Sequence, residues 1–117
     1  LAGSPPGIYG EGSVKMEVLE DGPIVIAGQR QLLAGSGDET DTCVTTAIDM
    51  AGITLQESLD MAALNPARLL GFEEISLEAG SRADLILFHY EGTGSRMNIQ
   101  TTLACGAVKY GTLLVNS

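Results

Sequence analysis

Side chains that bind metals or form disulfides are scarce in this sequence. It has one histidine, His89, and two cysteines, Cys43 and Cys105, which lie far apart and outside any CxxC motif. A catalytic zinc site needs three or four convergent ligands, so these residues predict no metal site of their own. We interpret the cysteines as small buried side chains in a reducing compartment. His89, inside an apolar run, is interpreted as a strand-end or surface residue.

Basic residues and long apolar runs are also few. Six Lys and Arg face 15 Asp and Glu, giving a net charge of -9, which disfavours nucleic acid and anionic membranes as partners. The longest apolar runs, such as residues 85–88, are far shorter than the roughly 20 residues that span a bilayer. No basic and then apolar leader opens the chain. The sequence therefore predicts a soluble, cytoplasmic protein without a membrane segment.

The first third of the chain has the pattern of a β-hairpin. Glycine and proline fill residues 1–12 and predict a loop. Apolar and polar residues alternate over residues 13–19, and Asp21-Gly22 then predicts a turn before a second strand at residues 24–26. Residues 32–34 are a candidate third strand, ended by the glycines that follow.

Helical spacing replaces this pattern in the middle of the chain. Residues 42–51 predict a helix that Gly52 terminates. Thr54 and Glu57 form a capping-box pattern for a second helix from Leu55 to about Ala63. A short third helix is expected to begin with Asn65 as its N-cap and to end at Gly71.

The last third returns to an extended pattern. Period-two or apolar stretches cover residues 84–90, 97–103, 107–110 and 112–115, and glycines interrupt them. Such spacing predicts a small antiparallel sheet. The order strands, helices, strands indicates an α+β fold with two to three helices.

Two motifs become specific when they occur together. Residues 65–71 read NPARLLG, and residues 80–88 read GSRADLILF. In this order and spacing the pair resembles the C-terminal signature of the amidohydrolase superfamily. Further segments resemble the N-acetylglucosamine-6-phosphate deacetylases, namely residues 7–9, the Asp21-Gly22 hairpin, and residues 33–36, 52–58 and 61–62. Together with the two motifs, the resemblance covers nearly the whole chain.

The resemblance implies a C-terminal fragment of a (β/α)8-barrel amidohydrolase, since a whole barrel needs about 200–250 residues. Residues 1–37 would be a loop and hairpin, residues 38–71 helices of the last barrel layer, and residues 72–117 strands of a β-sandwich. The parent enzyme would hydrolyse the N-acetyl group of an amino sugar phosphate with a divalent metal such as zinc. The family's metal-binding histidines and catalytic aspartate would precede Leu1, so the fragment alone is expected to carry no catalytic residue or cofactor and to be inactive.

The same resemblance implies candidate residues for contact with the substrate. The loop that matches Leu33, Ala34 and Gly35 gives backbone contacts to the amino sugar in the deacetylase family, although a turn with a capping Ser36 explains the same residues. Asp84 is interpreted as a structural acceptor that pins a strand. Arg68 suits a structural ion pair or, alternatively, a phosphate contact.

Two other functions stay open from the sequence. Dihydroorotases, aminoacylases and deaminases share the two motifs, and a non-catalytic β-rich structural or binding module would explain the composition. The apolar helical stripe is predicted to stay partly uncovered and to favour a homo-oligomer; it consists of Val44, Ile48, Leu55, Leu59 and Ala62.

Overall fold

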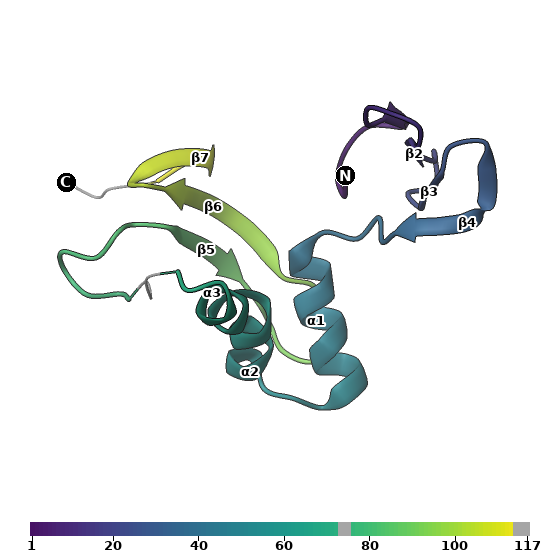
Figure 1. Ribbon diagram of the computed structural model, residues 1–117. Helices are drawn as coiled ribbons and strands as arrows, with labels where there is room; N and C mark the ends of the chain where they lie inside the picture. The colour runs from purple at the N-terminus through teal and green to yellow at the C-terminus, as the bar shows by residue number, and fades with distance from the viewer. Residues whose placement is uncertain (73–75, 114–117) are drawn as a thin grey trace. The chain divides into compact units, whose positions relative to one another are not determined.

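The computed structural model describes residues 1–72 and 76–113 (Figure 1). The chain divides into two compact units, residues 1–39 and 40–117. Both contain an antiparallel sheet, and the second also contains the helices. The α+β class expected from the sequence is therefore confirmed. Among the described residues, no helix has the length and apolar character needed to cross a membrane.

The first unit is a four-stranded sheet in the order β1-β2-β3-β4. Its strands are β1 (Gly7–Tyr9), β2 (Met16–Val18), β3 (Ile24–Ile26) and β4 (Gln29–Gly35). The predicted hairpin is confirmed, because β2 and β3 pair antiparallel across the Asp21-Gly22 turn. Its buried apolar side chains are Val18, Ile24 and Val25.

The expectation of a loop throughout residues 1–12 is wrong for Gly7–Tyr9. Gly7 pairs with Val18 and Tyr9 with Met16, so this stretch forms an edge strand. Strand pairing forms hydrogen bonds between backbone groups of residues that are distant in sequence. The unpaired edge of β2 can therefore pair with a segment even though the composition of that segment favours turns.

The second unit begins with α1 (Thr40–Ala51), two residues earlier than predicted. Gly52, at φ +66°, ends it in the left-handed conformation that glycine adopts without strain. Helix α2 (Leu55–Leu59) then starts at the predicted capping box. The amide of Glu57 donates to the Thr54 hydroxyl at 3.2 Å, and the Thr54 amide donates to the Glu57 carboxylate at 2.8 Å.

The predicted break between the second and third helices is wrong. A π-helical turn, η1 (Asp60–Leu64), joins α2 directly to α3 (Asn65–Leu69). Asn65 has helical dihedrals, φ -66° and ψ -44°, and its amide donates to the Asp60 carbonyl instead of capping a new helix. Because Pro66 has no N–H and its ring crowds the preceding turn, widening that turn lets the helix continue through the proline.

The second sheet has the order β5-β6-β7, all antiparallel. Its strands are β5 (Leu85–His89), β6 (Asn98–Ala104) and β7 (Ala107–Gly111), as predicted apart from their ends. Of the last predicted strand, residues 112 and 113 lie outside any strand, and residues 114 and 115 lie outside the described residues.

The core of the second unit lies between α1 and the segment entering β6. Val44, Ile48 and Met97 are buried there, and half-buried apolar residues pack around them, namely Ile53, Leu55, Leu59, Phe88, Tyr90 and Ile99. The predicted apolar stripe is partly covered, as expected: Val44 and Ile48 are buried, Leu55 and Leu59 are half-buried, and Ala62 is exposed. The interpretation of both cysteines as buried is wrong, because Cys43 and Cys105 are exposed free thiols.

Candidate functional site

The three residues nominated as substrate contacts lie at the end of an edge strand. Leu33 is 71% exposed, Ala34 is exposed and Gly35 is half-buried. They belong to β4, which pairs with β3 and is the outermost strand of its sheet as described (Figure 1). The sequence predicted a loop after residue 34, whereas the strand includes Gly35. An outer edge presents backbone N–H and C=O groups, the kind of contact that the resemblance implied.

Gly35 leaves open space beside this edge. A Cβ atom built on it would meet no heavy atom within 4 Å, and its φ lies outside the left-handed region. Ser36 is not the N-cap of α1, since its hydroxyl accepts from the Asp38 amide at 3.0 Å and α1 begins at Thr40. A side chain at position 35 would therefore meet neither a steric clash nor a left-handed backbone conformation.

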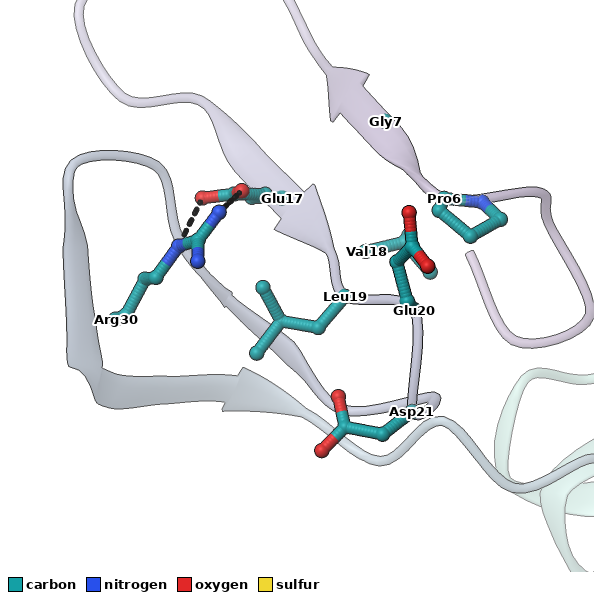
Figure 2. Close-up of a pocket in the computed structure, with 8 residues that line it drawn as sticks. All are labelled: Pro6, Gly7, Glu17, Val18, Leu19, Glu20, Asp21 and Arg30. Atoms are coloured by element: carbon teal, nitrogen blue, oxygen red, sulfur yellow. Dashed lines mark hydrogen bonds and ion pairs between the residues drawn. The ribbon is translucent and has the colours of Figure 1, made fainter.

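A hollow of about 540 Å³ lies on the first unit (Figure 2). Arg30 reaches across to Glu17, and their N–O distance is 2.6 Å. This contact raises the pKa of the Arg30 guanidinium, chiefly through its hydrogen bond to Glu17. The pair is largely exposed on the Arg30 side and therefore adds little to stability. The lining residues are Pro6, Gly7, Glu17, Val18, Leu19, Glu20, Asp21 and Arg30.

The charge of this hollow does not suit a phosphate. Three carboxylates, Glu17, Glu20 and Asp21, face one cation, Arg30, which Glu17 already pairs. Residues 33–35 are absent from its lining. The structure thus separates the nominated substrate contacts from the hollow, and no sequence pattern pointed to the Glu17–Arg30 pair, because the two residues come together only through strand pairing.

Asp84 has the structural role predicted for it. Its carboxylate accepts the Cys105 amide at 2.6 Å and pairs with Arg82 at 2.6 Å. The Cys105 amide is the main cause, and Arg82 a lesser one, of a pKa below the usual value. Cys105 and Gly106 have φ of +50° and +76° and form the tight turn between β6 and β7. Asp84 therefore ties the start of β5 to that turn.

The described residues do not fit a metal. Nowhere in residues 1–72 and 76–113 do three His, Cys, Asp or Glu side chains gather closely enough to hold an ion. His89 ends β5, as predicted, and its Nε2 atom lies 3.5 Å from Glu91 on the surface. Arg68 lies in the last turn of α3, and its proposed phosphate contact stays a hypothesis.

Comparison with known proteins identifies the family of this chain. The model of the Amidohydrolase family matches residues 14–109, most of the chain and both sequence motifs. The chain belongs to the amidohydrolase family. Within this amidohydrolase, the residues 65–71 motif covers α3 and its glycine terminus, and the residues 80–88 motif leads into β5.

The matched relatives are deacetylases. The chain is 30% identical over 94 residues to rat N-acetylglucosamine-6-phosphate deacetylase, covering 79% of this chain and 22% of the relative. It is 37% identical over 90 residues to N-acetylgalactosamine-6-phosphate deacetylase of Escherichia coli O157:H7, covering 73% of this chain and 22% of the relative. The chain thus spans about a fifth of the length of both relatives.

A solved structure is similar as well. It is a mutant of N-acetyl-D-glucosamine-6-phosphate deacetylase from Mycobacterium smegmatis in complex with N-acetyl-D-glucosamine-6-phosphate. The TM-score is 0.66 at 26% identity, and the match covers 92% of this chain and 27% of that one.

Proposed function

We propose that this amidohydrolase chain is the C-terminal part of an N-acetylhexosamine-6-phosphate deacetylase, an enzyme that hydrolyses the N-acetyl group of an amino sugar phosphate. The observation that carries the proposal is the agreement between relatives: the rat deacetylase, the E. coli O157:H7 deacetylase and the Mycobacterium smegmatis structure match 79%, 73% and 92% of the chain, and each is named as a deacetylase of an N-acetylated amino sugar 6-phosphate. The glucosamine and galactosamine sugars are both supported, because relatives named for each match over similar spans.

In this proposal, residues 33–35 contact the substrate through their backbone. The exposed outer edge of β4 and the open space beside Gly35 support that role. The acidic hollow is not assigned to substrate, because its carboxylates would repel a sugar phosphate.

The hydrolytic step belongs, in this proposal, to residues outside this chain. The family implies a divalent metal, and the described residues offer no group that fits one. The chain would accordingly be inactive by itself, contributing contacts rather than chemistry. A cytoplasmic location and homo-oligomer formation accompany the proposal as expectations.

A chimera tests the proposal. The matched part of the E. coli O157:H7 deacetylase is replaced by this chain, and release of acetate from both sugar phosphates is measured, with this chain alone and the intact relative as controls. We expect the chimera to be active and the chain alone to show no turnover. Turnover by the chain alone, with one metal ion bound per chain, would contradict the proposal; so would a folded chimera that deacetylates neither sugar.

A further inference from the structure

The aspartates of this chain differ in how their carboxylates are held. Asp21 is exposed, and within residues 1–72 and 76–113 its carboxylate has no hydrogen-bond partner. The carboxylates of all the other aspartates take part in a hydrogen bond; these residues are Asp38, Asp41, Asp49, Asp60 and Asp84. The side chain of Asp21 is therefore the one that can turn toward its own backbone without first giving up a hydrogen bond.

Asp21 is also the one aspartate that a glycine follows. Gly22 is exposed, and a Cβ atom built on it would meet no heavy atom within 4 Å. The amide nitrogen of a glycine is the least hindered nucleophile that a neighbouring carboxyl group can meet, since no side chain shields it. The structure thus places an unhindered amide beside a carboxylate that no hydrogen bond holds.

One hydrogen bond of the turn opposes a reaction between these groups. The Gly22 amide donates to the Leu19 carbonyl at 3.0 Å, and this bond must open before the nitrogen can attack. The turn is exposed, and the unit that contains it has 39 residues and buries three apolar side chains, those of Val18, Ile24 and Val25. Local opening of such a turn costs little free energy.

We propose that Asp21 is a modification site, where the Asp21–Gly22 linkage isomerises spontaneously through a cyclic succinimide to isoaspartate. The Gly22 nitrogen attacks Cγ of the protonated carboxyl group, a new N–Cγ bond replaces a C–O bond, and the oxygen leaves as water. Water then opens the ring. Addition at Cγ restores aspartate, whereas addition at the main-chain carbonyl carbon of Asp21 gives isoaspartate, in which the backbone runs through the former side chain. One water is lost and one is regained, so no oxidant or cofactor is needed, and the inference does not depend on the proposed function.

Isoaspartate lengthens the connection between β2 and β3 by one methylene group. These strands pair Val18 with Ile24 on the two sides of the turn, and both side chains are buried. The Gly22 carbonyl also lies against Gly37, where a Cβ atom would overlap it. A longer connection displaces both contacts, so the modification loosens the packing of the first unit.

The test measures isoaspartate in the whole chain after several weeks at pH 7, both folded and in guanidinium chloride. Trypsin releases residues 16–30, in which Asp21 is the single Asp or Asn, and electron-transfer mass spectrometry distinguishes isoaspartate from aspartate there. Met50→Gly is the matched variant, because it gives Asp49 a following glycine while the Gly94 amide still donates to the Asp49 carboxylate at 2.8 Å. Met50 is 83% exposed, so its loss removes little packing, and circular dichroism checks that the variant folds.

We expect isoaspartate at Asp21 in the folded chain. It should exceed that at Asp49 in folded Met50→Gly by at least about fivefold, because the Asp49 carboxylate must first give up its hydrogen bond. In guanidinium chloride the two sites should convert at similar rates, since neither is then held. Absence of isoaspartate at Asp21 in the folded, unchanged chain would overturn the inference, whether or not the denatured chain forms it. Equal conversion of both sites in the folded variant would also overturn it, because the sequence pair rather than the freedom of the carboxylate would then decide.

Discussion

At the scale of single residues, Asp84 has the environment with the clearest consequence. It accepts the Cys105 amide and pairs with Arg82, and both contacts favour its charged form. Its pKa in the folded chain therefore lies below the ordinary value of 3.8. A lowered folded pKa means that the carboxylate stabilises the fold above the ordinary pKa, and that this stabilisation is lost as the pH falls through the folded value.

Asp84→Asn should therefore lower the thermal midpoint at pH 7. The gap to the unchanged chain should narrow as the pH falls below about 4, because a protonated Asp84 resembles asparagine. Melts between pH 7 and pH 3 test this, with Glu91→Gln, an exposed carboxylate 3.5 Å from His89, as control. A gap that persists unchanged at pH 3 would show that Asp84 does not act through its charge.

Substitutions at two nearby glycines, Gly35 and Gly37, distinguish a glycine that contacts substrate from a glycine that the fold requires. A side chain at Gly35 meets open space, whereas a Cβ at Gly37 would overlap the Gly22 carbonyl. In the active chimera, Gly35→Val should raise KM at least about threefold and move the thermal midpoint by less than about 3 °C. Gly37→Val should instead mainly lower the midpoint. Normal kinetics with a large loss of stability at position 35 would favour a purely structural glycine.

At the scale of elements, the continuous helix from α2 to α3 depends on its first turn. Thr54 and Glu57 satisfy each other's backbone amides there. The contact also lowers the pKa of Glu57, chiefly through the Thr54 amide. The capping box thus fixes where the helix begins, whereas nothing comparable starts a new helix at Asn65.

Thr54→Ala should cost about 1 kcal/mol of unfolding free energy, because it leaves the Glu57 amide without its hydroxyl acceptor. Urea denaturation followed by circular dichroism measures this loss. Glu57→Gln is the matched control, since glutamine can also complete a capping box and should cost less. Asn65→Ala should cost little by comparison; a loss at Asn65 as large as that at Thr54 would mean that Asn65 caps a helix after all.

At the scale of the whole molecule, the two units differ in the apolar interior available to them. The first unit buries Val18, Ile24 and Val25 within 39 residues, whereas the second packs two helices and a sheet around Val44, Ile48 and Met97. Chains below about 40 residues seldom hold a fold without disulfides, metals or partners.

Residues 40–117 should therefore fold by themselves with a cooperative melt, whereas residues 1–39 should not. Circular dichroism of the two peptides, heated separately, measures the difference. Ile48→Ala should lower the unfolding free energy of the longer peptide by about 2–5 kcal/mol. A cooperative melt of residues 1–39 alone would show that three buried side chains suffice.

Local chemistry made several features predictable from sequence. Features that depend only on neighbouring residues can be recognised from the local sequence pattern. They are the capping box at Thr54, the helix-terminating glycines at residues 52 and 71, and the hairpin around Asp21-Gly22. The amidohydrolase motifs identified the family for the same reason, since short segments with fixed spacing carry them.

Tertiary structure decided the rest. Gly7–Tyr9 became a strand because β2 offered a free edge, and Gly35 joined β4 rather than a loop. Of the predicted apolar stripe, Val44 and Ile48 are buried against Met97, whereas Leu55 and Leu59 are half-buried and Ala62 is exposed. Apolar spacing shows that a helix has a face to cover, but which residues cover it depends on distant contacts that periodicity does not encode.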